Sequence, residues 1–553
     1  VTVILRKPGK QLNEYHQAGG WRPIALLNTI GKAIESLLAQ RLASFAEENG
    51  LLPDEQMGNR KGRSTETALR LLTDLVRTAW KHGGAATLLS LDISGAFDSV
   101  DHGRLLANLR ALRVPIWTIS WIRSFLSNRS TTLFFDSQES DEIPVPAGVP
   151  QGSPLSPILF CLYTAGLYKA LRAIPGTATI AFADDTNLVG FGLNPEQTCE
   201  RLEAAHRICK EWAVSHGMTF AVQKYHLVHF SRRRKGPDTK IALEGHEIEP
   251  EDSCRVLGIQ VDRRLRWDVH IQSISKKMAT QVYALDRIAG STWGASLQRA
   301  RQVYTAVVRS AIGYGASEWH RQISKNRAKA LNDVQTECLR KVTGAFKATA
   351  AAVLETEAYV SPLNTWLNRR VAASEERLQQ PRIASLIQAR CDSAARWILT
   401  RPTRRRRPKG PDAPDRKRWL NEWLAGDSAH KAEERDWLQR WQQTQQNRIA
   451  RAPAATKMPP DKHVLKLHRG LHKAESSILV QARTGKIGLR DFLFKRRVPG
   501  FDSPWCVCGQ GRETVRHILV FCPRERERRE HLVQALGGPI DTDRMLDTPG
   551  KAG

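Results

Sequence analysis

The amino-acid sequence predicts an α+β fold in which short strands carry acidic residues at their ends. Residues 177–191, TATIAFADDTNLVGF, are two β-rich runs with Asp184 and Asp185 at the turn between them, which is the pattern of a β-hairpin. Residues 87–91 form an apolar run that Asp92 closes. Longer stretches, such as 31–48, instead have apolar residues at helical spacing. These observations predict helices packed against a small antiparallel sheet.

Composition sets the class of partner. The chain has 553 residues, of which 41% are hydrophobic, enough for roughly three or four domains with their own cores. Its 84 Lys and Arg against 56 Asp and Glu give a net charge of +28, which favours a polyanion such as nucleic acid. No run of 18 apolar residues appears, which argues against a membrane span, and no signal-peptide pattern opens the chain. Nine scattered Cys indicate a reduced, intracellular protein, and the start at Val1 favours a fragment of a longer product.

The N-terminal segment predicts a basic hairpin, one helix and the start of a second helix near residue 65. Residues 3–28 contain two apolar runs around a Pro-Gly loop, and carry Lys7, Lys10 and Arg22. A helix is expected over 31–48, and Ser64 or Thr65 is expected to cap the next one. The basic loop before that cap contains Arg60, Lys61 and Arg63. These side chains are either solvated or, in a phosphate-binding role, in contact with nucleic acid.

Asp92 stands at the end of an apolar strand, where an unpaired carboxylate is costly unless a cation meets it. A helix is expected beyond Asp98, and another helix and a strand within 116–135. Residues 147–167 then place Gly148, Gly152 and three prolines before an apolar helix. This segment is either a tight turn or a loop whose backbone approaches a ligand closely.

Adjacent Asp184 and Asp185 repel one another, and a fold that holds them together commonly supplies a cation. Hard oxygen ligands of this type suit Mg²⁺. The alternative is ordinary turn chemistry, because Asp is common in hairpin turns. A helix over 195–216 and a strand-like segment over 220–230, which contains Lys224, follow.

Several of these blocks, in their order, resemble the reverse transcriptases of LINE-type, non-LTR retrotransposons. The blocks LDISGAFD, GVPQGSPLSPILF and FADD, followed by the Lys224 segment, resemble the palm of that family. The upstream RKPGK…WRPIALLN and QMGNRKGRST resemble its fingers, and CRVLGIQVDRRLRW resembles the strand between palm and thumb. The resemblance covers about residues 3–345. It implies a right-hand polymerase with fingers, an antiparallel palm sheet and a helical thumb over 270–343.

The resemblance implies that Asp92, Asp184 and Asp185 share one role. Two divalent ions about 3.5–4 Å apart can activate a 3′-hydroxyl and stabilise a pyrophosphate leaving group. The implied catalytic residues are Asp92 and Asp184, which bridge two Mg²⁺ ions, and Asp185 as a third carboxylate. The resemblance also implies that the backbone carbonyl of Ile93 completes the metal shell.

The same resemblance implies a binding site for the incoming nucleotide. Phe97 is expected under the sugar, where its ring would exclude a 2′-hydroxyl and so favour dNTPs. Gln151 and Gly152 would position the nucleotide, and Lys7 and Arg22 would hold its triphosphate. Lys224 is a candidate proton donor to pyrophosphate, with a surface salt bridge as the alternative.

Residues 401–420 contain nine basic and two acidic residues among four prolines. The run Arg404, Arg405, Arg406 and Arg407 is expected either to bind phosphate and direct nuclear import or to be a solvated tether. Four tryptophans follow in two pairs spaced by four, for which core packing is favoured over base stacking.

Near the C-terminus, Cys506-x-Cys508-x8-His517-x4-Cys522 gathers soft ligands, although six of the nine Cys lie elsewhere. Three thiolates and one imidazole form a closed set that selects one structural zinc ion. The spacing resembles the CCHC knuckle that follows the polymerase in LINE-type proteins.

The sequence therefore predicts an RNA-directed DNA polymerase that copies element RNA from a 3′-hydroxyl, at a nicked genomic target, in the nucleus after cytoplasmic assembly with RNA. Its expected partners are template RNA, primer or target DNA and dNTPs, with no membrane. The expected divisions are 1–245 for fingers and palm, 246–345 for the end of the palm and the thumb, 346–460 for a helical, basic linker and 461–553 for the C-terminal region. The alternatives are an inactive remnant that binds nucleic acid and a group II intron maturase, which the CCHC pattern disfavours.

Overall fold

The computed structural model describes residues 1–7, 9–398, 416–446, 458–542 and 546. The chain divides into two compact units. The first contains residues 1–269 and 376–414, and the second contains 270–375 and 415–553. The described residues 376–398 therefore return to the first unit, which a division of the chain into consecutive ranges does not express. Within the described residues, no helix combines the length and apolarity needed to cross a bilayer.

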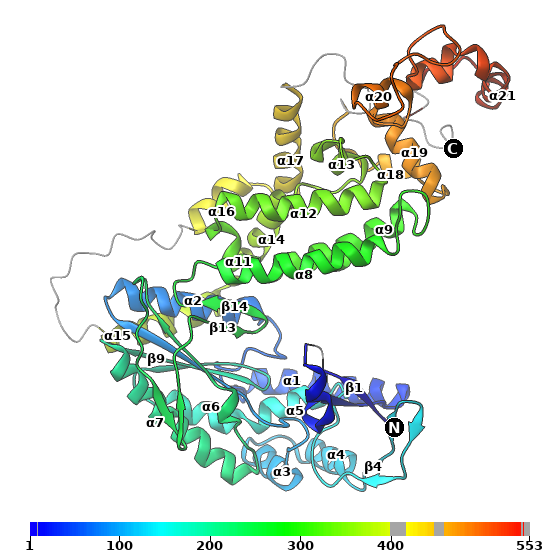
Figure 1. Ribbon diagram of the computed structural model, residues 1–553. Coiled ribbons are helices and arrows are strands. Elements are labelled where there is room, and N and C mark those ends of the chain that lie inside the picture. The colour runs from blue at the N-terminus through cyan, green and yellow to red at the C-terminus, as the bar shows by residue number, and fades with distance from the viewer. Residues whose placement is uncertain (8, 399–415, 447–457, 543–545, 547–553) are drawn as a thin grey trace. The chain divides into compact units, whose positions relative to one another are not determined.

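The centre of the first unit is an antiparallel sheet with strand order β10–β3–β9–β8 (Figure 1). Its strands are β3 (Ala85–Leu91), β8 (Thr177–Phe182), β9 (Asp185–Gly192) and β10 (His226–Phe230). Leu88 and Leu89 of β3 are both fully buried. Since neighbouring residues of a strand point to opposite faces, both faces of this sheet are covered.

Helix α7 (Pro195–His216) covers one face of the sheet. The side-chain hydroxyls of Thr87 and Thr198 lie 2.6 Å apart, and a Cβ atom on Gly190 would lie only 2.7 Å from the Thr198 carbonyl oxygen. Phe191, the next residue, points to the opposite face and shares a cavity with α15 (Pro381–Ile398). Helix α2 (Thr65–Lys81) packs beside α15.

A second sheet begins at the N-terminus. Strands β1 (Thr2–Arg6) and β2 (Trp21–Ala25) form an antiparallel hairpin, and β1 also pairs in parallel with β5 (Leu133–Phe135). The remaining elements of this unit are α1 (Thr29–Glu48), α3 (His102–Ala111), α4 (Ile116–Leu126), β4 (Ser130–Thr131), β6 (Gln138–Glu139), β7 (Ile143–Pro144), α5 (Ser156–Tyr163), α6 (Ala165–Arg172), β11 (Ile241–Leu243), β12 (His246–Ile248), β13 (Ser253–Val256) and β14 (Ile259–Asp262).

The second unit is helical within the described residues. Its core contains Tyr304, whose hydroxyl donates to Gln335 at 2.8 Å, and a buried ion pair between Arg483 and Glu357. Its helices are α8 (Asp268–Asp286), α9 (Leu297–Val303), α10 (Ser310–Ile312), α11 (Ala316–Trp319), α12 (Lys325–Thr343), α13 (Ala351–Glu357), α14 (Leu363–Leu378), α16 (Arg416–Leu424), α17 (Ala429–Gln446), α18 (Val464–Leu467), α19 (Lys473–Thr484), α20 (Arg490–Lys495) and α21 (Arg526–Leu536). The first residues of α8 and the last of α14 belong to the first unit.

The local predictions agree with these elements. Ser64 caps α2 by accepting a hydrogen bond from the Thr67 amide, and Asp101 caps α3 in the same way through the Arg104 amide, as short polar residues at N-caps do. The 220–230 segment differs from expectation. Only residues 226–230 form a strand, and Lys224 lies in a short 3₁₀ turn, residues 222–224.

Candidate functional site

The ends of three strands bring the predicted carboxylates together. The β3–β9 register pairs Leu91 with Thr186, so Asp92 and Asp185 are the next residue on each strand. Asp184 lies in the two-residue turn between β8 and β9, whose first residue, Ala183, has φ +57°. A positive φ at this position is what tight hairpin turns of this length require. The sheet topology thus presents all three carboxylates at one edge.

A buried glutamine that the sequence did not indicate holds this turn in place. Gln56 is fully buried, and its side-chain oxygen accepts hydrogen bonds from the Ala183 amide and the Gly58 amide, both at 2.9 Å. Its side-chain amide donates to the Ala183 carbonyl at 3.2 Å. A Cβ atom on Gly58 would lie 2.5 Å from the Ala183 nitrogen, so only glycine permits this approach.

Desolvation and like charges raise the pKa values of Asp184 and Asp185. Desolvation and then the Asp92 carboxylate raise the pKa of Asp184, and the Arg22 guanidinium opposes them. Desolvation, Asp184 and Asp92 raise the pKa of Asp185 to about 6, with Arg255 acting in the opposite direction. Proximity of several carboxylates has this effect because each disfavours ionisation of the others. A bound cation would therefore stabilise the ionised carboxylates at this edge.

Lys224 supplies one positive charge. Its Nζ atom lies 2.8 Å from Asp92 Oδ2, and both side chains are about half exposed, at 57% and 43%. The ion pair expected as the alternative for Lys224 is therefore present. Ile93 also lies at this edge. It forms an isolated bridge with Phe220, whose two hydrogen bonds use the Asp92 carbonyl and the Ser94 amide and leave out the Ile93 carbonyl.

The loop over 147–153 lies against α1 and β2. Gly148 has φ +86°, and a Cβ atom there would lie 2.7 Å from the Asp98 carbonyl oxygen. Gly152 has φ +121°, and its Cβ would lie 2.6 Å from the Ala25 carbonyl oxygen. Both positions thus need glycine, as the sequence suggested. Ser153 also hydrogen-bonds the buried Glu35 of α1.

Gln151 and Phe97 are fixed by this packing. The Gln151 side-chain amide donates to both Asp98 carboxylate oxygens at 2.9 Å. The Gln151 backbone carbonyl accepts a hydrogen bond from the Ala25 amide at 2.7 Å. The Phe97 ring stacks on Phe160 at 5.0 Å between centroids, and its carbonyl accepts from the Val149 amide. Asp98 is a further residue that sequence reasoning missed as a partner of Gln151.

The basic side chains that were predicted to bind phosphate groups lie in different surroundings. Arg22 is exposed on β2 and acts electrostatically on Asp184, whereas the Lys7 ammonium donates to the Gly19 carbonyl of its own hairpin at 3.0 Å. Arg63 differs from its expected role in nucleic-acid binding, because its side chain is 3% exposed and pairs with Asp54 at 2.6 Å. The run Arg404–Arg407 lies outside the described residues.

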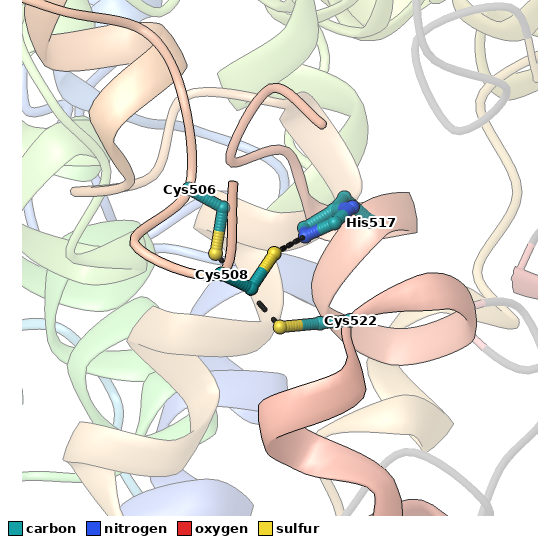
Figure 2. A group of neighbouring side chains, drawn as sticks. All are labelled: Cys506, Cys508, His517 and Cys522. Atoms are coloured by element: carbon teal, nitrogen blue, oxygen red, sulfur yellow. Dashed lines mark hydrogen bonds between the residues drawn. The ribbon is translucent and has the colours of Figure 1, made fainter. Parts of the chain in front are cut away.

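The C-terminal cluster brings together all four residues predicted from spacing (Figure 2). One ligand atom from each of Cys506, Cys508, His517 and Cys522 lies within 4.8 Å of the others. Cys506 Sγ and Cys522 Sγ are 3.8 Å apart, and Cys508 Sγ is 3.2 Å from His517 Nε2. Among the described residues, the three carboxylates of the first unit form no cluster this tight.

Local hydrogen bonds form the cluster. The Cys506 amide donates to the Gly511 carbonyl, and the Gly509 amide returns to the Cys506 carbonyl, so the two thiols project from one tight turn. Burial raises the pKa of Cys506 to about 11, whereas a hydrogen bond from the Gln510 amide lowers that of Cys508. A Cβ on Gly511 would lie 2.9 Å from His517 Nδ1, which explains a glycine there.

Comparison with known proteins agrees with this geometry. Residues 5–261 match the family described as reverse transcriptase (RNA-dependent DNA polymerase). Residues 5–261 are a reverse transcriptase domain. The span includes β3, β8 and β9 with the three carboxylates, and the loop that carries Gln151.

The curated relatives of this chain are RNA-directed DNA polymerases and Pol polyproteins of transposable elements. The chain is 27% identical to the probable RNA-directed DNA polymerase from transposon X-element of Drosophila melanogaster, over 69% of this chain and 42% of that protein. It is 25% identical to the RNA-directed DNA polymerase from mobile element jockey, also of Drosophila melanogaster, over 62% and 37%. The Pol polyprotein from type-1 retrotransposable element R1 of Bradysia coprophila is 26% identical over 93% of this chain and 47% of its own length. The chain thus spans less than half the length of these relatives.

Among solved structures, telomerase from Candida tropicalis in complex with a fragment of telomeric RNA aligns with 68% of this chain and 62% of its own, at 12% identity and a TM-score of 0.34. That similarity is too distant to support an inference about this chain.

Proposed function

We propose that this reverse transcriptase domain is an active RNA-directed DNA polymerase, and that Asp92, Asp184 and Asp185 are its catalytic residues. The observation that carries the proposal is the β3–β9 register, which sets Asp92 beside Asp185 and the Asp184 turn. Desolvation, together with neighbouring carboxylates, raises the pKa values of Asp184 and Asp185, and a divalent cation would offset both effects. Magnesium is the cation that oxygen donors of this kind and substrate phosphates hold together.

These residues would hold two Mg²⁺ ions, with the Ile93 carbonyl as a further ligand. When bound, the ions supply Lewis-acid stabilisation of the attacking and leaving oxygens. The chain's own residues orient the substrates. Arg22 would balance triphosphate charge, together with Lys7 once that side chain leaves its own hairpin. The ion pair with Asp92 places Lys224 beside the proposed metal site. If nucleotide binding releases this ion pair, Lys224 could donate a proton to pyrophosphate.

The loop over 147–153 and Phe97 would form the nucleotide pocket. Gln151 is held by Asp98 and by β2, which fixes where a base and sugar can lie. The Phe97 ring is anchored on Phe160, so it cannot yield easily to a 2′-hydroxyl. This arrangement supports dNTPs as substrates. The proposed template is RNA, and the proposed primer is a DNA 3′-hydroxyl at a nicked genomic target.

The cluster of Cys506, Cys508, His517 and Cys522 would bind one structural zinc ion. A tetrahedral site with Zn–S bonds of about 2.3 Å separates its sulfurs by about 3.8 Å, which is the distance between Cys506 Sγ and Cys522 Sγ. With four protein ligands no position is left for substrate, so the ion would organise this segment as a knuckle.

Nuclear localisation is part of the proposed function, because the proposed target is chromosomal DNA.

The test is primer extension on homopolymer RNA with Mg²⁺ and dNTPs. Purified wild-type protein should extend an annealed oligo(dT) primer on poly(rA), and an Asp184→Asn variant of equal thermal stability should not. A wild type that binds the template but never extends it would make the chain a nucleic-acid-binding remnant and refute the proposal.

A further inference from the structure

Helix α4 and the segments around it form a basic surface that carries one exposed tryptophan, Trp117. Residues 102–135 contain five Arg and no Asp or Glu. Within the described part of the chain, none of these five arginines has a carboxylate oxygen within 4.0 Å. Arginines elsewhere in the same unit are commonly paired, as Arg60 is with Glu47 and Arg390 with Glu55. The charges of these five arginines are therefore not held in ion pairs.

The aromatic residues lie along one side of α4 at helical spacing. Trp117, Trp121 and Phe125 are four residues apart, and Trp117 is 58% exposed. The Trp121 and Phe125 rings are nearly parallel, 14° apart, with centroids 5.5 Å from each other. The Arg129 guanidinium lies over the Phe125 ring at 5.1 Å. Trp121 and Phe125 are partly buried and pack against the core, so Trp117 is the ring of this row that is open to solvent. An exposed aromatic ring of this kind can stack with a base.

The C-terminal end of α4 opens into a groove of about 380 Å³. Its lining includes Arg123, Arg129, Asn128 and His102, and no carboxylate. Two acids of the neighbouring segments accept hydrogen bonds from serine hydroxyls. Glu142 bonds the Ser130 hydroxyl, and Glu35, which acts on Arg129 through space, bonds Ser153.

The groove continues into the nucleotide loop. Pro144, Val145 and Pro146 form one wall, and the next residues are the start of the loop over 147–153. His102 Nε2 lies 2.8 Å from the Gly148 carbonyl oxygen, and the Val145 amide donates to the Arg129 carbonyl. A nucleic-acid strand that passed this loop would therefore meet the cations of the groove before it reached Trp117 at the other end of α4.

We propose that the α4 surface, defined by Trp117, Trp121, Phe125, Arg123 and Arg129, binds a single-stranded segment of the template RNA outside the catalytic centre. The proposal rests on the proposed polymerase function, which supplies the RNA. Charge complementarity selects a polyanion over an apolar protein partner, and stacking explains the exposed Trp117.

Photo-crosslinking tests the location directly and needs no polymerisation. A primer–template with 4-thiouridine in its single-stranded overhang is bound to the full chain carrying Asp184→Asn, irradiated and digested for mass spectrometry. Crosslinks are expected on residues 116–129. Crosslinks elsewhere in the chain with none on this segment would overturn the inference, whereas the proposed function fails separately if wild-type protein cannot extend a primer.

Affinity measurements then test the chemistry. For fluorescent oligo(rU), Trp117→Ala should weaken binding about five-fold or more, as loss of one stacked base does, and Trp117→Phe should restore it. Arg123→Gln should reduce the slope of log K against log salt by about 1. Matched controls are Trp293→Ala, where the ring is 54% exposed, and Arg207→Gln on the exposed side of α7.

Thermal melting monitored by circular dichroism should show that Trp117→Ala folds, because more than half of the ring is already in solvent. If Trp117→Ala changes sedimentation of the protein but not its RNA affinity, α4 is a contact between protein chains and the RNA inference is wrong.

Discussion

The two candidate metal sites of this chain are constructed in opposite ways. The cluster of Cys506, Cys508, His517 and Cys522 is local, since 16 positions separate its outermost ligands and a single turn carries two of them. The carboxylate edge joins β3 to a hairpin about 90 residues later and is clamped by Gln56, 127 positions before Ala183. A local site depends on its ion for order, whereas a long-range site depends on the surrounding fold. Each prediction below separates these two dependences.

The largest effect is expected at the carboxylate edge. Asp184→Asn should reduce primer extension at least about 10³-fold, because the amide keeps the shape but loses the charge that holds Mg²⁺. Asp92→Asn and Asp185→Asn should behave similarly. RNA affinity, measured by fluorescence anisotropy, should change little, since most cations of the chain lie elsewhere. Near-normal extension by the Asp184 variant would contradict the two-metal assignment.

The C-terminal cluster should fail differently. Cys506→Ser plus Cys508→Ser should abolish binding of one zinc ion per chain, measured by metal analysis, and unfold only the segment around 505–522. Metal-binding free energy is largely folding free energy in so small a unit. Extension on a pre-annealed template should persist, because the first unit has its own core. Cys391→Ser, a cysteine outside the cluster, is the matched control. Wild-type protein that purifies without zinc would refute the site.

Gln56 tests the long-range clamp without touching a metal ligand. Gln56→Leu removes three hydrogen bonds to the turn and its neighbour, each worth about 1 kcal/mol, and leaves buried amides unsatisfied. Misplacement of Asp184 should lower kcat by about 10- to 100-fold, since small errors of position are costly in catalysis. The apparent Mg²⁺ requirement should rise with it. A variant that lost stability but kept kcat would show that Gln56 only supports folding. Gln138→Leu, at an exposed position in β6, is the control.

Whether the sequence could predict the role of a residue depends on the same difference between local and long-range contacts. Spacing alone predicted which three Cys and one His come together, because their contacts are local in the chain. The acids at 92, 184 and 185 could be placed because each ends or joins a recognisable strand. Gln56 and Asp98 could not, since their partners are set by tertiary packing and neither residue stands out in its own segment. Arg63 shows the converse. A basic residue in a polar loop predicted a nucleic-acid contact, but Asp54 nine positions earlier pairs with it.

Phe97 tests whether the nucleotide pocket is as rigid as its packing suggests. Phe97→Val should increase incorporation of rNTP relative to dNTP by about ten-fold or more, because a smaller side chain leaves room for a 2′-hydroxyl, and selectivity of 1–3 kcal/mol is typical of such steric differences. Single-nucleotide extension with each substrate measures the ratio. Phe160→Leu beneath the ring should have a smaller effect in the same direction. An unchanged ratio in Phe97→Val would make Phe97 a core residue only.

The smallest effect concerns the stability of the metal-free carboxylate edge. Desolvation and then repulsion by Asp184 and Asp92 raise the pKa of Asp185 to about 6 in the folded chain, above the value of about 3.9 in an unfolded chain. The folded state therefore binds a proton more tightly, so the contribution of this group to stability is full below pH about 4 and is lost as pH rises through about 6. In EDTA, Asp185→Asn should raise the melting temperature at pH 8 and make little difference at pH 4. Asp136→Asn, in the exposed turn between β5 and β6, should show no such dependence. Added Mg²⁺ should reduce or reverse the advantage at pH 8, because the ion would then stabilise the wild-type carboxylate and not the amide. An advantage that is independent of both pH and Mg²⁺ would mean that Asp185 is strained by packing, not by the charges of Asp92 and Asp184.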